Sequence, residues 1–185
     1  MSIVLNKVSK SYDSKAVISD FSYTFEDGKN YLIKGESGSC KTTLINLILG
    51  LTDLSSGSIT GTNKYSVVFQ EDRLLEGFSS IDNLRFVNKE LDVQTISSEL
   101  SILIPGIDIT KNISTLSGGM KRRVAIARAM LSKSDVVIMD EPFTGLDSKS
   151  VEATIEFIKK HQNGRTLIIT SHVFDELTEF IRIDI

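Results

Sequence analysis

The sequence predicts an α/β fold built around a mostly parallel sheet. Short apolar stretches of strand length occur at residues 65–70, 135–142 and 165–172. Stretches of helical periodicity lie between them, at residues 118–131 and 148–164. This alternation is typical of parallel sheets whose faces are covered by helices. The helix at 118–131 is expected to be apolar on one side and basic on the other.

The composition is that of an ordinary globular protein, with 185 residues, 41% hydrophobic and 24% charged. The net charge of −3 gives no reason to expect nucleic acid as a partner. No stretch approaches the roughly 18 consecutive apolar residues of a membrane span, and the N-terminus lacks signal-peptide features. Cys40 is the only cysteine, which excludes an internal disulfide and a cysteine-based metal cluster. We expect a cytoplasmic protein that can still sit against a membrane protein.

Two N-terminal stretches, residues 2–12 and 16–28, are rich in β-branched and aromatic residues, and the second ends in an Asp-Gly turn signal. They predict a small antiparallel β-lobe that leads into a strand at residues 30–35. A loop then precedes residues 42–51, which have apolar residues on every side, the pattern of a buried helix.

Residues 71–115 lack strands of this kind and predict a helical lobe inserted into the α/β core. Within it, residues 79–104 have a mostly helical pattern, with Ser80 or Asp82 as candidate N-caps. The sequence contains no internal repeat, low-complexity tract or clear linker, so residues 1–185 are expected to form a single domain.

The stretch GESGSCKT, residues 35–42, has the context of a phosphate loop between a strand and a helix. It matches the pattern G-x-x-x-x-G-K-[ST], except that Cys40 replaces the glycine before Lys41. Backbone N–H groups of such a loop point at anionic oxygens, Lys41 would bring charge to the outer phosphates, and Thr42 would offer its hydroxyl to Mg²⁺. On this stretch alone, a polar turn before a helix is the alternative.

Two acidic residues, Asp140 and Glu141, end the apolar strand VVIMDE. Placed beside Thr42, Asp140 could hold Mg²⁺ through water, and Glu141 would then face the terminal phosphate. Two acids that only solvate a strand end are the alternative, but a carboxylate pair downstream of a phosphate loop has a chemical role.

Six stretches stand in the order found in one family: Tyr12, GESGSCKT, VVFQED, LSGGM, VVIMDEP followed by GLD, and TSH. With them the chain resembles the nucleotide-binding domains of ATP-binding cassette (ABC) transporters, which have a P-loop NTPase core. LSGG, residues 116–119, is this family's signature. The stretches span residues 12–172, so the resemblance implies that residues 1–185 are a single ABC ATPase domain.

The resemblance implies how ATP and Mg²⁺ would be bound. Tyr12 would stack on adenine, and Thr42, Gln70 and Asp140 would hold the metal. The phosphate contacts would come from Gly35, Ser37, Gly38, Ser39, Cys40, Lys41, Thr42 and Thr43.

For catalysis, the resemblance implies a Mg-dependent ATPase in which Glu141 is the general base. Gln70 would reach the metal and the attacking water, and His172 would contact the γ-phosphate. The other histidine, His161, has no motif around it and is expected to be solvated.

The signature implies a head-to-tail dimer with a second ABC subunit, in a homodimer or a heterodimer. Ser117, Gly118 and Gly119 begin a helix that would face the ATP of the opposite subunit, because helix N-termini favour anions. Asp147, in GLDS, would cross the same interface. ATP would close the dimer and hydrolysis would reopen it, moving transmembrane permease subunits that are separate polypeptides at the inner face of the membrane.

The chain departs from the family pattern at several places. Met120 replaces a commoner glutamine, the stretch before Gln70 is short, and the chain ends at Ile185, soon after His172. Three stretches, FQEDRLL, SGGMKRRVAIARA and DEPFTGLD, resemble importers of the nitrate, sulfonate and taurine type, and an exporter stays open. A non-transport ABC ATPase would need a coiled-coil insertion, zinc cysteines or a second cassette. A regulatory subunit impaired in hydrolysis is the remaining alternative.

Cys40 is the departure closest to the nucleotide. Glycine at this position permits positive φ, and a side chain held there would cost about 1 kcal/mol or more. We therefore expect either a strained loop with weakened ATP affinity or a shifted loop. A small residue that is tolerated with little effect is the alternative.

Overall fold

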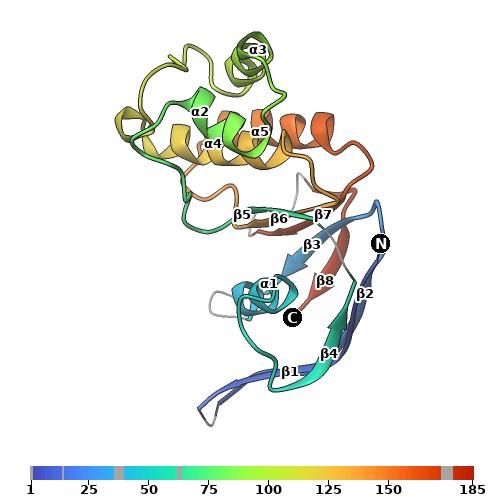
Figure 1. Ribbon diagram of the computed structural model, residues 1–185. Helices are drawn as coiled ribbons and strands as arrows, with labels where there is room; N and C mark the ends of the chain where they lie inside the picture. Colours follow the sequence, from blue (N-terminus) through green and yellow to red (C-terminus); the bar gives the residue numbers. More distant parts are fainter. Residues whose placement is uncertain (1, 14, 36–39, 62–63, 172–176) are drawn as a thin grey trace.

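The computed structural model describes residues 2–13, 15–35, 40–61, 64–171 and 177–185. A five-stranded parallel sheet forms its centre, and a three-stranded antiparallel sheet lies on one side of it (Figure 1). None of the helices in these ranges is both long and apolar enough to cross a membrane. In sheet order, the central strands are β5 (Tyr65–Val68), β6 (Val136–Asp140), β7 (Thr166–Thr170), β3 (Asn30–Lys34) and β8 (Ile181–Asp184).

The antiparallel sheet has the order β2-β1-β4 and forms the small N-terminal lobe. Its strands are β1 (Ile3–Tyr12), β2 (Lys15–Phe25) and β4 (Ser56–Thr60). Helix α1 (Lys41–Ile48) packs between this lobe and the central sheet, and together they bury one of the two hydrophobic cores.

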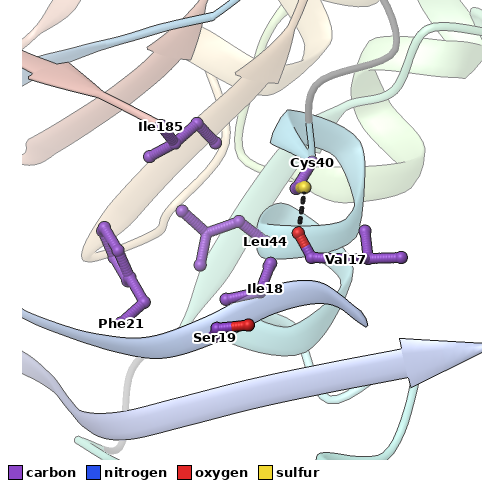
Figure 2. Close-up of a pocket in the computed structure, with 7 residues that line it drawn as sticks. All are labelled: Val17, Ile18, Ser19, Phe21, Cys40, Leu44 and Ile185. Carbon is purple, nitrogen blue, oxygen red and sulfur yellow. Dashed lines mark hydrogen bonds between the residues drawn. The ribbon is translucent and has the colours of Figure 1, made fainter. Parts of the chain in front are cut away.

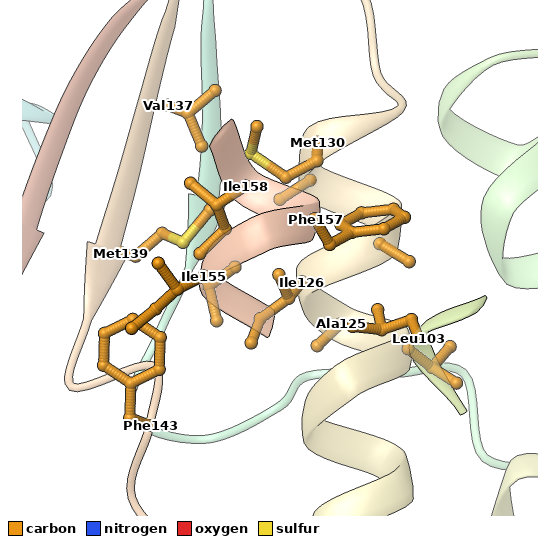
Figure 3. Packing of buried hydrophobic residues seen from close by; sticks show 14 of the residues in the cluster. Leu103, Ala125, Ile126, Met130, Val137, Met139, Phe143, Ile155, Phe157 and Ile158 are labelled. Atoms are coloured by element: carbon orange, nitrogen blue, oxygen red, sulfur yellow. The ribbon is translucent and has the colours of Figure 1, made fainter. Parts of the chain in front are cut away.

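The opposite face of the central sheet carries the other helices (Figure 1). Successive strand residues point to opposite faces, so Tyr31 and Ile33 of β3 enter the core with α1 while Leu32 enters the other core. In Figure 3, Ile155 and Ile158 lie beside Met139 of β6. The helices are α2 (Ser80–Val87), α3 (Val93–Leu103), α4 (Gly118–Met130) and α5 (Ser148–His161), with a short 3₁₀ helix at Ile113–Thr115.

The predicted fold class is confirmed, including the antiparallel lobe and the helical stretch within residues 71–115. The expected helical run at 79–104 is two helices, α2 and α3. The prediction that Ser80 or Asp82 caps this helix was wrong. The N-cap of α2 is Ser79, the residue before Ser80. Asp82 instead completes a capping box, because its carboxylate accepts from the Ser79 N–H while Ser79 Oγ accepts from the Asp82 N–H.

Strands β4 and β8 were not predicted from the sequence. The β4 residues, SGSIT, have the composition of a turn, and they become a strand only by pairing with β1. Gly57 has a φ of +89°, and a Cβ added to it would lie 2.2 Å from the carbonyl oxygen of Lys7. Glycine is therefore required where β4 approaches β1, although glycine alone argues against a strand. β8 has only four residues, too few for a clear periodic pattern.

The expectation that His161 is solvated was wrong. His161 Nε2 lies 2.9 Å from Glu99 Oε2, and its ring centroid lies 4.4 Å from that of Phe157. Lys160 Nζ lies 2.9 Å from both carboxylate oxygens of Glu99. Because Glu99 is in α3 and both partners are in α5, this cluster ties the helical lobe to the core.

Glu99→Gln tests this tie. Burial raises the pKa of Glu99, but hydrogen bonds from Lys160 and His161 lower the pKa more, so the net shift is downward. A lowered pKa in the folded state gives stability above the ordinary value of 4.5 that is lost as the pH falls. We expect Glu99→Gln to reduce the free energy of unfolding by about 1–2 kcal/mol at pH 7, measured by urea denaturation.

The same difference should shrink as the pH falls below 4.5, the ordinary pKa of glutamate. The matched control is Glu156→Gln, which removes an exposed pair with Lys159 on α5 and should cost less than about 0.5 kcal/mol. Equal effects of the two substitutions at pH 7 would contradict the role of the cluster.

Candidate functional site

The candidate site lies at the carboxyl edge of the central sheet. Because the strands are parallel, the residues that follow them meet at one edge. Gly35 follows β3, Gln70 comes two residues after β5, and Glu141 follows β6. The parallel sheet thus brings Gly35 of the predicted phosphate loop, the glutamine and the acidic pair to the same edge. His172, predicted to follow β7, lies outside the described residues.

The described part of the phosphate loop consists of Gly35 and the residues from Cys40 onward. Ser37, Gly38 and Ser39 lie outside the described residues. Helix α1 begins at Lys41, and Thr42 and Thr43 occupy its first turn, as predicted. Lys41 is buried, with 5% of its surface exposed, and its Nζ donates to the Gly35 carbonyl oxygen at 2.7 Å. The ammonium group therefore lies at Gly35, the first residue of the predicted loop.

Asp140 is hydrogen-bonded from two sides. Thr42 Oγ1 donates to Asp140 Oδ2 at 2.8 Å, and Thr170 Oγ1 donates to Asp140 Oδ1 at 2.6 Å. Asp140 therefore lies beside Thr42, as predicted. Both side chains offer oxygen atoms, which are the ligands that Mg²⁺ prefers, and the metal commonly takes its other ligands from phosphates and water. The described residues hold no group of three or more His, Cys, Asp or Glu side chains suited to a metal.

Glu141 has a left-handed backbone conformation, with a φ of 47°. Such a conformation costs a non-glycine residue roughly 1–2 kcal/mol. The Glu141 N–H donates to the Thr170 carbonyl oxygen at 3.1 Å and to Thr170 Oγ1 at 2.9 Å, which stabilises the turn. Strained backbone of this kind is common at functional sites, because it can point a side chain in a direction that a relaxed strand would not allow.

Arg122 was not recognised from the sequence as part of the site. One guanidinium nitrogen donates to the Phe69 carbonyl oxygen at 2.6 Å and to Asp72 Oδ1 at 3.1 Å. The other donates to the carbonyl oxygens of Asp140 at 3.2 Å and Glu141 at 2.7 Å. Arg122 is 4% exposed, so it does not belong to a solvated basic face.

A sequence signal for this position was available. Arg122 stands three, four and seven residues before Ala125, Ile126 and Ala129, which are all buried. That spacing places it on the apolar face of α4, and a cation on an apolar face needs a buried partner.

Tyr12 and Gln70 are both accessible. Tyr12 ends β1 with 47% of its surface exposed, and Lys10 Nζ lies 4.8 Å from its ring centroid. Gln70 is also exposed, next to Phe69, whose ring faces the guanidinium of Arg73 at 3.7 Å.

The predicted signature residues are at the start of α4, as expected. Ser117 is the N-cap and accepts a hydrogen bond from the Met120 N–H at 3.3 Å, while Gly118 and Gly119 form the first turn. Asp147 caps α5 in the same way, accepting from the Ser150 N–H at 2.9 Å. This hydrogen bond from the Ser150 backbone is the main reason that the pKa of Asp147 lies below its usual range.

Cys40 does not have the positive φ on which the expected backbone strain depended. Cys40 is the N-cap of α1 with a φ of −60°, which an L-residue adopts without penalty. Its thiol donates to the Val17 carbonyl oxygen of β2 (Figure 2). The thiol also lines an apolar cavity of about 210 Å³ between β2 and α1. The cavity is lined by Val17, Ile18, Ser19, Phe21, Cys40, Leu44 and Ile185.

A parallel sheet with a phosphate loop after β3 and an acidic end on β6 places the chain in the P-loop NTPase fold class. A family model described as ABC transporter matches residues 18–144, and the chain belongs to this family.

Curated relatives agree with this assignment. The Nod factor export ATP-binding protein I of Rhizobium johnstonii is 32% identical over 95% of this chain and 63% of its own length. The aliphatic sulfonates import ATP-binding protein SsuB 1 of Paracoccus denitrificans is 33% identical over 94% of this chain and 74% of its own length. The chain spans about three fifths of the length of the Nod factor relatives. An exporter and an importer match almost equally, so similarity does not separate the two directions of transport.

Thr170→Val tests the hydrogen bonds around Asp140 and Glu141. The substitution keeps the shape of a fully buried side chain and removes its hydroxyl from both neighbours. We expect the free energy of unfolding to fall by about 1–3 kcal/mol, measured by chemical denaturation, because buried polar atoms lose their partner. Thr154→Val is the control, since its buried hydroxyl donates to the Ser150 carbonyl oxygen of its own helix, α5. A loss no larger than the control's would count against the role of Thr170.

Proposed function

We propose that this chain binds Mg-ATP and hydrolyses it as the ATP-binding subunit of a membrane transporter. The observation that carries the proposal is the contact of Thr42 with Asp140, which joins the phosphate loop to the acidic end of β6. Membership of the ABC transporter family supports it, as do relatives that are named as ATP-binding proteins. Residues 1–185 would act as one ATPase domain.

Lys41 and the N-terminus of α1 would hold the phosphates. The Lys41 ammonium donates to the carbonyl oxygen of Gly35, and it would donate to a phosphate oxygen when ATP is bound. The α1 N-terminus adds backbone N–H groups and the positive end of the helix dipole. The other loop residues of the proposed cradle are Gly35, Ser37, Gly38, Ser39, Cys40, Thr42 and Thr43.

Thr42 and Asp140 would hold Mg²⁺, with Gln70 reaching the same metal. When bound, the ion supplies positive charge to the phosphate oxygens of ATP. The existing hydrogen bond between Thr42 and Asp140 keeps the two oxygen atoms that would bind the metal next to each other. Thr170 keeps the other Asp140 oxygen occupied, so the carboxylate is oriented before the nucleotide arrives.

Glu141 would act as the general base toward the water that attacks the γ-phosphate. General-base assistance is worth about 10²–10⁴-fold in rate. The left-handed backbone of Glu141, together with its hydrogen bonds to Thr170, fixes the start of its side chain at the carboxyl edge. Gln70 would help to position the water, and His172 would contact the γ-phosphate.

A second ABC subunit would complete the site in a head-to-tail dimer. Ser117, Gly118 and Gly119 begin the 13-residue helix α4, and Ser117 and Gly118 are exposed. An exposed helix N-terminus is suited to the phosphates of an ATP held by the other subunit. Asp147, at the start of α5, would lie in the same interface, and Tyr12 would stack on the adenine.

Transmembrane permease subunits, as separate polypeptides, would be the membrane partners. The helical lobe exposes apolar side chains at Leu75 (37%), Phe78 (55%) and Phe86 (74%). These three residues, with Asp82 and Arg85, surround one surface hollow. Exposed apolar surface rimmed by charge is typical of protein interfaces. The chain would thus lie in the cytoplasm against the inner face of the membrane, and nothing in its charge favours nucleic acid.

Glu141→Gln tests the proposed reaction. Wild-type protein should release phosphate from ATP only with Mg²⁺, and the Gln variant should be slower by about 10²-fold or more. The variant should still bind ATP and should elute as an ATP-stabilised dimer from a sizing column. Glu152→Gln, an exposed glutamate of α5, is the matched control and should keep the wild-type rate.

Equal rates of wild type and Glu141→Gln would refute the role of Glu141. A monomer at saturating ATP would argue against the head-to-tail dimer. ATP binding without hydrolysis by the wild type would favour the alternative, a regulatory subunit impaired in hydrolysis.

Cys40→Gly tests whether the unusual loop residue weakens ATP binding. Because Cys40 has an unstrained φ and its thiol bonds Val17 in β2, we expect ATP affinity to change by less than about threefold. The measurement is an equilibrium titration with a fluorescent ATP analogue, and Lys41→Ala, which should lose binding, checks the assay. A gain of about tenfold in Cys40→Gly would show that the cysteine impairs the site.

A further inference from the structure

We propose that Arg122 is a positioning residue for ATP hydrolysis, which holds the backbone of Glu141 and the segment around Gln70 in one fixed arrangement. The inference rests on the proposed function. It concerns a side chain of α4 that has no place in the predicted set of ATP, metal or catalytic contacts. Its evidence is the geometry of the guanidinium and the conformation of the two segments that it joins.

The guanidinium joins two segments that are far apart in the sequence. Its Nη1 bonds the Phe69 carbonyl oxygen and Asp72 Oδ1, and its Nη2 bonds the carbonyl oxygens of Asp140 and Glu141. Nη1 therefore binds the segment after β5, and Nη2 binds the segment at the end of β6. The Arg122 side chain is 5% exposed, so water does not compete for these hydrogen bonds.

On one side, Arg122 completes the restraint of Glu141. The Glu141 N–H is held by Thr170 of β7, and its carbonyl oxygen is held by Arg122 of α4. Both hydrogen-bonding groups of the Glu141 backbone thus have a partner on a different element. The left-handed conformation at φ 47° is retained between these two anchors, and this conformation sets where the side chain begins.

On the other side, Arg122 restrains the segment that contains Gln70. Gln70 lies between Phe69 and Asp72, and both of these accept hydrogen bonds from Arg122. Arg128, further along α4, donates to the Asp72 carbonyl oxygen at 3.3 Å. The exposed Gln70 side chain therefore projects from a backbone that α4 holds on either side.

Arginine suits this position, and lysine does not. A guanidinium has five N–H donors in a planar fork, whereas an ammonium is a single point that cannot reach two segments in different directions. Asp72, at 3.1 Å, balances the charge of Arg122. Because Ser117 caps α4, the helix that would face the second ATP is the same helix that holds Glu141. A movement of α4 relative to the sheet would therefore change the position of Glu141, the proposed general base.

The test compares Arg122→Lys with Arg165→Lys. Arg165 is the matched control, because its guanidinium also bonds backbone carbonyl oxygens, including that of Met130 at 2.7 Å, but at the amino end of β7. For each variant we would measure kcat, the Kd for ATP and thermal unfolding. We expect Arg122→Lys to lower kcat by about tenfold or more with Kd within about twofold, since misplacement of a reacting group can cost about 10²-fold. Arg165→Lys should lower stability comparably and leave kcat within about twofold.

A double substitution separates positioning from general structural support. If Arg122 acts through Glu141, then Arg122→Lys should cause little further loss in the Glu141→Gln background. An equal loss in both backgrounds would overturn the proposal, as would a wild-type kcat in Arg122→Lys. If Arg122→Lys does not fold, Asp72→Asn takes its place, and a kcat lowered about threefold or more at unchanged Kd is then required.

Failure of this inference is distinguishable from failure of the proposed function. If the wild-type protein does not hydrolyse ATP, both the proposed function and this inference are wrong. Wild-type hydrolysis that depends on Glu141 but not on Arg122 would remove this inference alone.

Discussion

The carboxylate of Asp140 connects the elements on which the site depends. It accepts one hydrogen bond from Thr42 in α1 and one from Thr170 in β7, while its own strand, β6, lies beside β7 in the parallel sheet. Three separate parts of the chain therefore meet at one side chain with 2% exposure. A buried carboxylate is costly unless hydrogen-bonded, so these bonds both stabilise the fold and orient the oxygens that would hold a metal.

Glu141 illustrates how the surroundings of a site maintain an unfavourable conformation. Its left-handed backbone is held by Thr170 on one side and by Arg122 on the other. Without these anchors, such a strand end would relax toward the backbone conformations that non-glycine residues prefer. Strand β7 of the central sheet and helix α4 thus act together on the backbone of one residue.

The two lobes have different relations to this centre. The antiparallel lobe shares a core with α1 and touches the phosphate loop through Cys40 and Val17. The helical lobe is held through α3 and α5, where Glu99 bonds Lys160 and His161, and it has exposed apolar side chains at Leu75, Phe78 and Phe86. The antiparallel lobe therefore lies beside the start of α1, the helical lobe carries exposed apolar side chains, and both are anchored to the same central body.

Local patterns in the sequence determined much of this protein. Apolar strands, periodic helices and the spacing of GESGSCKT, LSGG and VVIMDE were sufficient for the fold class and for the pairing of Thr42 with Asp140. Tertiary structure alone decided the rest. SGSIT is a strand only because β1 pairs with it, Cys40 avoids strain because its φ is negative, and Arg122 reaches two segments about 50 and 20 residues away in the sequence. Such contacts depend on which distant groups meet after folding, and no local pattern records that.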